Sequence, residues 1–405
     1  MTKVTIIDKI YRKSHKGVKS IMDLVQAEKI KALSIKSGQW MLLSCLMAIL
    51  IANSPWQSIY NDFNQLNLAI HIGSFKIGKP LIIWMNEGLM AIFFFVIGLE
   101  IREALESGTL SDWKTVSLPI YGAIGGMVVP GLVYYLFNHP YPEYISGWAI
   151  PVATDIAFSL AILAMVTPGV QPKLRLFLST LAIVDDIGAI IVIALFYSDH
   201  LSFIWFLTAC GWLGLALILR AYKVSRFFPY LFISVFMWYA IIYSGLHATL
   251  TGVILAMILP KKNQYGKSMV NTLLHELEPW VNFGILPLFA FMNCGILLHG
   301  FSSETLMHPI LSGTFLGLWL GKPLGVMAFI LLATGLKLSI KDKDILWRQL
   351  IGIACLTGIG FTMSLFIASL SFEHQLSLLP NAKLGIILGS IFSGLMGSYF
   401  LIKSK

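Results

Sequence analysis

Four ionisable side chains lie inside apolar segments of the chain, where they could carry proton or cation chemistry. Asp185 and Asp186 are adjacent within LSTLAIVDDIGAIIVIALFY, Asp155 lies within GWAIPVATDIAFSLAILAM, and Lys322 lies within FLGLWLGKPLGVMAFI. A charge at the centre of a membrane costs at least ~2.5–3.5 kcal/mol, so such residues are rare and usually functional. These four side chains are the first candidates for the chemistry of the protein.

The adjacent pair Asp185–Asp186 favours an exchange of protons for a cation. Neighbouring residues of a helix project about 100° apart, so one carboxylate can face an ion cavity while the other faces Lys322. Desolvation and mutual repulsion allow such a pair to be protonated near neutral pH, and the two groups titrate together. The same oxygens, with Thr154 Oγ, carbonyls near Asp155 and water, can bind a hard cation. Protons and the cation then compete for one site.

Simpler roles are open for two of these side chains. Asp155 could cap a helix that begins after it, and this role is compatible with ion contact. Lys322 could extend along apolar surface to the membrane interface. A purely structural role is disfavoured for the Asp185–Asp186 pair, because both residues lie in the middle of an apolar run.

The elements that hold these residues are predicted to be membrane-spanning helices. The 405 residues are 57% hydrophobic and only 12% charged, whereas soluble proteins carry about 25% charged residues. A helix needs ~20 residues to cross a bilayer, and a transmembrane barrel would show alternating segments of ~10 residues instead. Apolar runs cover residues 40–53, 81–99, 116–137, 145–166, 174–197, 201–219, 227–259, 280–298, 310–333, 350–372 and 384–402. The pattern predicts an all-α polytopic membrane protein and excludes a soluble domain.

Basic residues indicate the number and the orientation of the spans. The run 227–259 is long for one crossing, and basic clusters lie at both of its ends. Because basic loops belong on the cytoplasmic side, we expect two short helices that bend near Ser244–Gly245, and twelve spans with both termini in the cytoplasm. On this topology 25 of the 29 Lys and Arg residues face the cytoplasm, three face outside and Lys322 lies inside a span. The net charge of +9 then reflects topology and lipid contact, and no nucleic acid partner is expected.

Two segments lie outside the predicted spans. Residues 1–39 form a basic cytoplasmic segment, which could be an amphipathic helix on the inner leaflet or an unstructured tail, and residues 40–405 form a single transmembrane domain. No cleavable signal peptide is expected, because the first apolar run follows too long a basic segment. Apolar residues alternate around Gly73–Ser74, which predicts either a small β-hairpin that a partner subunit could cover or an ordinary loop.

Two predicted spans are interrupted at matching places in two groups of three. The fourth span is broken by Pro151 before Thr154–Asp155, and the eleventh by Gly358 and Gly360. Non-helical backbone persists at this depth only where it lines a cavity or is buried in protein. Broken helices at matching places in two halves mark the binding site of a transporter. An ordinary Pro or Gly kink explains either break alone, but the pair favours a site.

Two further ionisable residues lie near the ends of predicted helices. Glu100 lies at the cytoplasmic end of the second span, where a position in the wet inner mouth is favoured over ion binding. His247 lies in YSGLHATLTG, where a hydrogen-bonded packing role is favoured over a pH sensor. Small residues at four-residue spacing, all glycine in 313–325 and glycine with Ser393 in 385–397, predict close helix packing rather than a ligand site.

Six segments of the chain together resemble the NhaA-type bacterial sodium/proton antiporters. They are, in order, ATDIAFSLAIL, LAIVDDIGAIIVIALFY, SGLHATLTGV, LPLFAFMNCG, GKPLG and GIGFTMSLFIASL, and the resemblance runs from about residue 38 to 402. It implies twelve helices with an inverted repeat of spans 3–5 and 10–12, in which the discontinuous fourth and eleventh helices cross. This family is a known example of broken helices in inverted repeats, so the repeat described above is not independent of the resemblance.

The resemblance also implies roles for the ionisable residues. Asp186 matches the main cation ligand, Asp185 its proton-carrying neighbour, and Lys322 the lysine that pairs with this neighbour. Thr154 and Asp155 match residues at the helix crossing, where Asp155 and Lys322 offset the facing dipole ends of the half-helices. Together they imply an electrogenic antiporter, not an enzyme, that exports Na+ or Li+ for two protons and serves pH and sodium homeostasis. These ions are substrates, and no cofactor is expected. The implied location is the bacterial inner membrane, where members often dimerise through the hairpin at 66–79.

Two regions depart from the family's pattern. GLEIREA stands where the family usually has GLEVKRE, and Leu274 precedes His275 where well-studied members carry an acidic residue. Both regions are linked to pH activation in relatives. Glu100, His247 and His275 are therefore candidates for a pH response, but the family's pH profile is not carried over.

Three other functions are compatible with parts of the pattern. A sodium-coupled solute symporter would also use broken helices, around a larger pocket. An intramembrane aspartyl protease could pair Asp155 with Asp185, but its GxGD motif is absent and Asp186 and Lys322 would have no role. A channel would show neither saturation nor coupling to protons.

Overall fold

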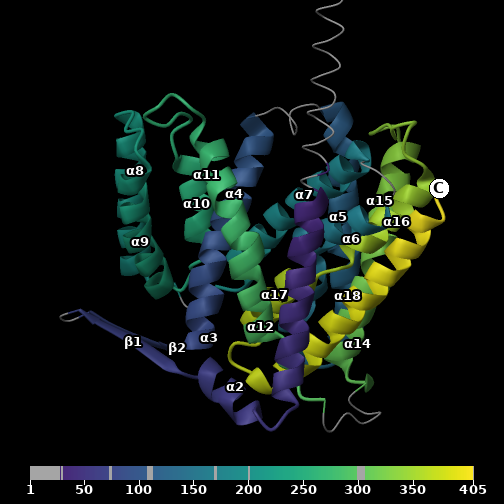
Figure 1. Cartoon of the computed structure of the whole chain (residues 1–405), viewed down its shortest axis with the longest axis horizontal. Coiled ribbons are helices and arrows are strands. Elements are labelled where there is room, and N and C mark those ends of the chain that lie inside the picture. Colours follow the sequence, from purple (N-terminus) through teal and green to yellow (C-terminus); the bar gives the residue numbers. More distant parts are fainter. Residues whose placement is uncertain are drawn as a thin grey trace, which may run out of the picture.

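The computed structural model describes residue 28 and residues 31–72, 75–106, 113–167, 171–198, 201–298 and 306–404, with the backbone alone at 70–72, 75–77, 79, 114 and 115. Within these ranges the chain is a bundle of helices with one two-stranded sheet (Figure 1). Residues 1–27, which form most of the predicted N-terminal segment, and the predicted turn Gly73–Ser74 lie outside the described residues.

Nine helices of the described chain are long and apolar enough to cross a membrane, and the bent pair η2 (Pro142–Val152) and α6 (Ile156–Val166) makes a tenth. The nine are Lys31–Ala52; α3 (Leu81–Trp84), η1 (Met85–Leu89) and α4 (Met90–Glu106); α5 (Trp113–Asn138); α7 (Pro172–Phe196); α8 (Phe203–Ala221); α9 (Phe227–Ser244); α14 (Pro309–Leu316), η4 (Gly317–Gly321) and α15 (Lys322–Gly335); α16 (Trp347–Thr357) and α17 (Phe361–Ser371); and η5 (Leu376–Leu378) and α18 (Leu379–Ile402). These helices confirm the prediction of a helical membrane protein.

Two predicted spans lie outside this set. The bend predicted near Ser244–Gly245 is confirmed, because α9 ends at Ser244, Gly245 has a φ of 86° and α10 (Leu250–Ile258) follows. Glycine adopts this left-handed conformation without strain. The helix predicted from residue 280 begins instead at Met269, through α11 (Met269–Trp280), η3 (Val281–Ile285) and α12 (Leu286–Asn293). The predicted start was wrong because α11 is amphipathic. Its polar residues precede the uniformly apolar run, so hydropathy alone did not include them in the span.

The predicted hairpin is present beside the helix bundle. After the short helix α2 (Gln57–Asn64), β1 (Asn67–Ile72) pairs antiparallel with β2 (Phe75–Pro80), and Ile72 lies opposite Phe75. This register is the one that a two-residue connection at positions 73 and 74 requires. The hairpin projects from the bundle at the lower left of Figure 1.

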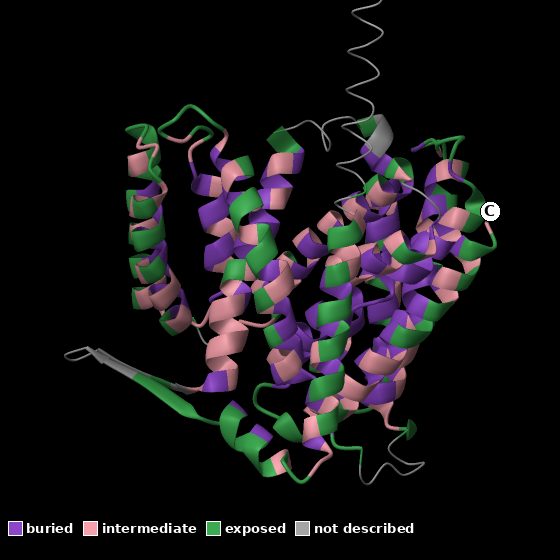
Figure 2. Ribbon diagram, in the orientation of Figure 1, coloured by how far each residue is buried: buried purple, intermediate pink, exposed green. Residues whose placement is uncertain are grey.

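The helices at the centre of the bundle approach one another closely. A Cβ atom added at Gly325 would lie 2.1 Å from the carbonyl oxygen of Gly125, and one at Gly125 would lie 2.1 Å from that of Gly325. This contact brings α15 against α5 and confirms close packing for the 313–325 glycines. The span Trp347–Ser371 is the most enclosed of the nine, with 94% of its apolar window buried. Buried residues are concentrated around it in Figure 2.

Candidate functional site

The first interruption lies between η2 and α6. Residues 153–155 are extended, and the two helices are bent by 45° across them. Asp155 is the N-cap of α6, because its Oδ1 accepts the backbone N–H of Phe158 at 2.9 Å. An acidic N-cap satisfies a backbone donor and favours the positive end of the helix dipole. The capping role predicted for Asp155 is therefore confirmed.

The same carboxylate also reaches the second interruption, between α16 and α17. Asp155 Oδ2 accepts the backbone N–H of Thr362 at 3.1 Å and its hydroxyl at 2.5 Å. The backbone N–H of Asp155 donates to the carbonyl oxygen of Ile359 at 2.7 Å. One buried carboxylate thus satisfies the N-terminal ends of two helices, α6 and α17, that meet at the centre of the bundle.

Lys322 contacts the η2 end of the first interruption, whereas Asp155 caps the α6 end. Its Nζ is 3.0 Å from Asp185 Oδ2, and both side chains are fully buried. It also donates to the carbonyl oxygen of Val152, the last residue of η2. The predicted pairing with Asp185 is confirmed, and extension to the membrane interface was wrong. Lys322 directly follows the π-turn η4 and precedes Pro323, in the middle of its span. π-turns inside helices are frequent at functional sites.

Thr154 connects Asp185 to the second interruption. Its Oγ1 is 2.7 Å from Asp185 Oδ2 and 3.0 Å from the carbonyl oxygen of Thr357, the last residue of α16. A hydroxyl has one hydrogen, so Thr154 donates to only one of these oxygens at a time. If Asp185 carried a proton, it could donate to Thr154 and free that hydroxyl for Thr357.

Asp186 differs from Asp185, whose Oδ2 is held by Thr154 and Lys322 and whose Oδ1 alone lacks a hydrogen-bond partner in the described chain. Asp186 is 1% exposed, and neither of its carboxylate oxygens has a hydrogen-bond partner among the residues that the structure describes. Asp186 lines a cavity of the described chain, whereas Asp185 does not. The two adjacent carboxylates therefore point in different directions, as the helix geometry predicts: one toward Lys322 and one toward open space.

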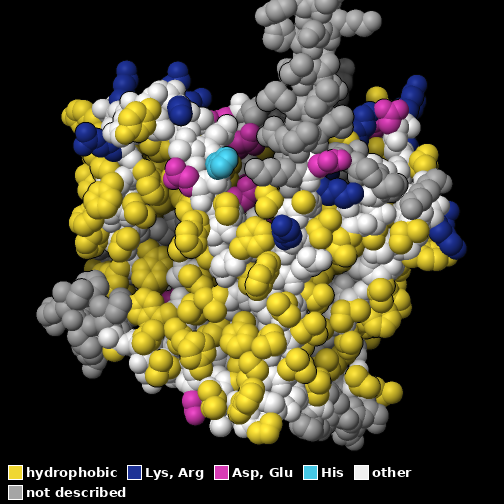
Figure 3. Space-filling model, in the orientation of Figure 1, with side chains coloured by type: hydrophobic (Ala, Val, Ile, Leu, Met, Phe, Trp, Pro, Cys, Tyr) yellow, Lys and Arg dark blue, Asp and Glu magenta, His cyan; other side chains and the backbone are white. Residues whose placement is uncertain are grey.

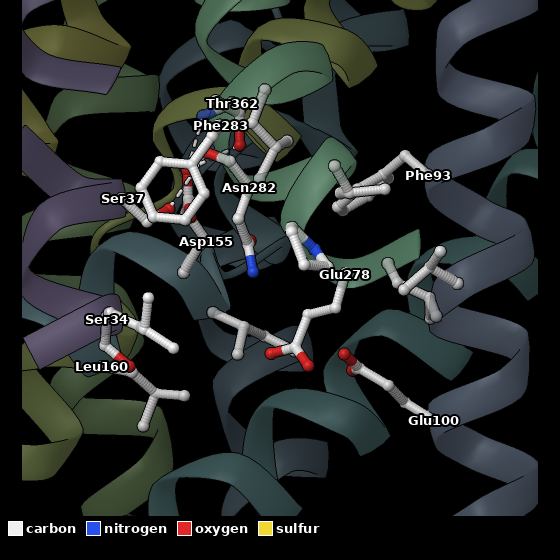
Figure 4. Close-up of a pocket in the computed structure, with 18 of the residues that line it drawn as sticks. Ser34, Ser37, Phe93, Glu100, Asp155, Leu160, Glu278, Asn282, Phe283 and Thr362 are labelled. Atoms are coloured by element: carbon white, nitrogen blue, oxygen red, sulfur yellow. Dashed lines mark hydrogen bonds between the residues drawn. The ribbon is translucent and has the colours of Figure 1, made fainter. Parts of the chain in front are cut away.

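The cavity has a volume of about 780 Å³ and contains most of the predicted site. Thr154, Asp155 and Asp186 line it, together with Glu100, His275 and Glu278. Figure 4 shows the carboxylates of Glu100 and Glu278 pointing toward each other across this space, with Asp155 and Thr362 on another wall. His247, in contrast, lies in the turn between α9 and α10 and is not among the lining residues.

Two charged lining residues were missed as site candidates. Arg175 lies in the first turn of α7 and Glu278 near the end of α11, and both line the cavity. From the sequence, Arg175 resembled one of the basic residues that mark a cytoplasmic loop. Glu278 lay outside the apolar run that defined its span. Only the fold shows that these helix ends converge on the cavity.

The chain matches a protein-family model described as Na+/H+ antiporter 1 over residues 28–401. The chain belongs to this family. It is 43% identical to the Na(+)/H(+) antiporter NhaA of Haemophilus ducreyi over 379 residues, which cover 93% of this chain and 96% of the relative. It is 45% identical to the protein of the same name from Shewanella baltica over 367 residues, or 90% of this chain and 94% of the relative. The family resemblance inferred from the six segments is confirmed.

Proposed function

We propose that the protein is an electrogenic antiporter that exports Na+ or Li+ in exchange for two protons. The observation that supports this proposal most is the difference in contacts between Asp185 and Asp186. Asp186 is buried, lines the cavity and offers two oxygens without a partner in the described chain, while Asp185 is held by Lys322. A hard cation prefers such oxygen ligands, and Thr154 and Asp155 line the same cavity.

The exchange follows from competition between protons and the cation. In the proton-loaded form, Asp185 and Asp186 each carry a proton. A cation that enters from the cytoplasm takes the place of the proton on Asp186, and its approach favours ionisation of Asp185, which then pairs with Lys322. Two protons leave for one cation. Lys322 keeps a hydrogen bond to Val152 while Asp185 is neutral, so its charge is not left without an acceptor.

This stoichiometry lets the membrane potential drive export. Each cycle moves one net positive charge inward, and 100 mV supplies ~2.3 kcal/mol per charge. At ~1.4 kcal/mol per decade, that sustains roughly a 40-fold additional cation gradient. Such a transporter serves intracellular pH and sodium homeostasis. The proposal needs no cofactor, because Na+ or Li+ and H+ are the transported substrates.

The proposed arrangement is twelve spans in the bacterial inner membrane with both termini in the cytoplasm. Ten spans are long and apolar enough to cross a membrane when the bent pair is counted as one. Together with α10 and the helix Met269–Asn293 they would make twelve. The two interrupted pairs, η2–α6 and α16–α17, would be the discontinuous fourth and eleventh spans. The visible Lys and Arg side chains lie mainly in the upper half of Figure 3, which supports a cytoplasmic face there. Lys31, where the first span begins, would lie at this face, and the hairpin at 66–79 would join two copies.

Two alternatives can be weighed against the geometry. A sodium-coupled symporter is compatible with a cavity of about 780 Å³, so only an assay separates it. A protease dyad of Asp155 and Asp185 is not supported, because each carboxylate is bonded to different partners: Thr362 and Phe158 for the first, Thr154 and Lys322 for the second.

The proposal is tested in inside-out vesicles that carry a pH-sensitive dye and a preformed proton gradient. Na+, Li+ and K+ are added in turn, with no organic solute present. Na+ and Li+ should dissipate the gradient, K+ should not, and the dissipation should saturate. A requirement for an organic solute would favour a symporter. The rate and endpoint should also respond to a potential set by K+ and valinomycin; indifference to that potential would overturn two-for-one exchange.

A further inference from the structure

The short helix α2, beside the hairpin, presents three different faces. Trp56 and Ile59 are each 64% exposed and Phe63 is 44% exposed, at the spacing of one helical stripe. Tyr60 and Asn64 are buried on a second face. The third face carries exposed polar side chains, Ser58, Asn61 and Asp62. The two exposed faces of α2, one apolar and one polar, therefore suit two different environments.

The buried face fixes the helix against the end of α12. The Tyr60 hydroxyl lies 2.7 Å from the carbonyl oxygen of Phe291 and 3.0 Å from that of Met292, and it donates to one of them at a time. It accepts the backbone N–H of Gly295 at 3.2 Å. A Cβ atom added at Gly295 would lie 2.3 Å from the Tyr60 ring, so the contact is tight. The direction of the apolar stripe is therefore set by the fold.

The apolar stripe follows a candidate span whose exposed face is also apolar. In the helix Lys31–Ala52, Leu43, Leu46, Met47 and Leu50 are exposed at helical spacing, and only residues 53–56 separate this helix from α2. In Figure 2, α2 is largely exposed and lies at the lower end of the bundle. The Lys and Arg side chains visible in Figure 3 gather toward the opposite end.

The chemistry of the stripe indicates its partner. Three side chains are too few for a stable subunit contact, which buries about 800 Å² per partner. Residues 56–64 contain no Lys or Arg, so anionic headgroups are not attracted. Tryptophan and large apolar side chains on one face of a helix, with polar residues on the other, are typical of the boundary between headgroups and acyl chains.

We propose that α2 lies in the outer leaflet of the bilayer, parallel to its surface. Trp56, Ile59 and Phe63 enter the acyl boundary of zwitterionic lipid, Ser58 and Asn61 face water, and Tyr60 transmits the anchoring to the outer end of α12. The inner part of the same continuous helix, α11, carries His275 and Glu278, which line the cavity. Lipid contact would thus hold one end of a cavity-lining helix in place. The inference does not depend on the proposed ion stoichiometry.

Spin labels on the full chain in phosphatidylcholine vesicles test the placement. Cys210 is exposed and is replaced by Ser, while Cys45, Cys294 and Cys355 are buried and remain. Single cysteines at positions 59 and 63 are compared with matched ones at 58 and 61. Power saturation at 59 and 63 should respond more to oxygen, which partitions into lipid, and at 58 and 61 more to a water-soluble nickel chelate. Greater access to the nickel chelate at all four positions would overturn the proposal.

Two further measurements keep the test independent of labelling. Spectral broadening at 59 that disappears when labelled protein is diluted with unlabelled protein would mean that a second copy covers the stripe, and would also overturn the proposal. In the chain with all of its cysteines, lipids brominated near the headgroup should quench more tryptophan emission than they do in Trp56→Phe. Equal quenching would contradict contact of Trp56 with lipid.

Discussion

The two interrupted helix pairs meet at the centre of the bundle, but different groups bond the free backbone atoms at each break. At the η2–α6 break, charged side chains are used: Asp155 caps α6, and Lys322 donates to the last carbonyl of η2. At the α16–α17 break, no charged residue of its own is present in residues 357–362. Thr357 donates to Ala354 in the preceding turn at 2.7 Å, and Gly360 is the N-cap of α17. The charged group that contacts the second break is Asp155, which belongs to the first break and accepts hydrogen bonds from Thr362.

Two serine contacts show how far the breaks correspond. Ser159 of α6 donates to the carbonyl oxygen of Leu356 at 2.9 Å, and Ser364 of α17 donates to that of Ile150 at 2.7 Å. Each helix thus bonds to the segment that precedes the other break. The uncharged contacts are reciprocal, whereas the ionisable groups lie on one side. We infer that the reciprocal contacts hold the crossing together and that the charged side senses the ions.

The largest expected effect is on the charged side, at Asp186. Asp186→Asn keeps the shape of the side chain but removes the negative charge and the protonation site. Cation-driven proton release in vesicles should fall to the level of empty vesicles, while the variant still folds, because Asp186 holds no other described side chain. The matched control is Asp62→Asn on the exposed face of α2, which should exchange normally. Clear residual exchange in Asp186→Asn would refute its role as ligand.

Removal of Lys322 should chiefly lower stability. Lys322→Met leaves Asp185 and the Val152 carbonyl buried without their donor, and breaking a buried ion pair costs about 3–5 kcal/mol. The thermal midpoint in detergent should drop strongly. The double variant Asp185→Asn with Lys322→Met removes both charges, so it should be more stable than Lys322→Met alone. If the double variant is as unstable as the single one, the loss comes from packing and not from the orphaned carboxylate.

The sequence was sufficient for those features that depend on local pattern. Hydropathy located the nine long apolar helices and the bent pair. The glycine at 245 located a bend, and the 100° step between Asp185 and Asp186 predicted their separate directions. It could not show that Asp155 accepts hydrogen bonds from Thr362, in the first turn of a helix that begins more than 200 positions later, at Phe361. That contact exists only after the breaks cross. For the same reason Arg175 and Glu278 were missed as residues that line the cavity. The pH response expected of His247 stays a prediction, and this residue is not among those that line the cavity.

Matched threonine variants should separate the two breaks. Thr154→Val removes the hydroxyl that lies between Asp185 and Thr357, and leaving a buried polar group unsatisfied costs about 1–3 kcal/mol. We expect the pH profile of exchange to shift, because ionised Asp185 loses one donor. Thr154→Ser should restore it. Thr357→Val removes only a local bond within α16, so it should lower stability slightly and leave the pH profile unchanged. Equal shifts in Thr154→Val and Thr357→Val would contradict the assignment of ion sensing to one side.

The smallest expected effect is at an exposed ion pair between the segment that follows α6 and the loop that precedes α16. Lys173, at the start of α7, is 2.8 Å from Asp342 Oδ2 and also contacts Asp344, in the loop before α16. Lys173 and the backbone N–H of Asp344 hold the pKa of Asp342 below its usual value. A carboxylate with a lowered pKa contributes its stability fully above the ordinary pKa and loses it only as the pH falls through the lowered one.

Asp342→Asn should therefore lower the thermal midpoint slightly and by a constant amount between about pH 6 and 8, since the titration lies far below this range. Both side chains are substantially exposed, 53% for Lys173 and 42% for Asp342, so high salt should remove most of the difference. Lys343→Ala, at an exposed position of the same loop, controls for a general loss of loop charge. A difference that changes across the neutral range would make this tie part of the pH response. A constant difference in thermal midpoint would mean that this ion pair takes no part in the pH response, which would then be sought at the η2–α6 break and the cavity that Asp155 lines.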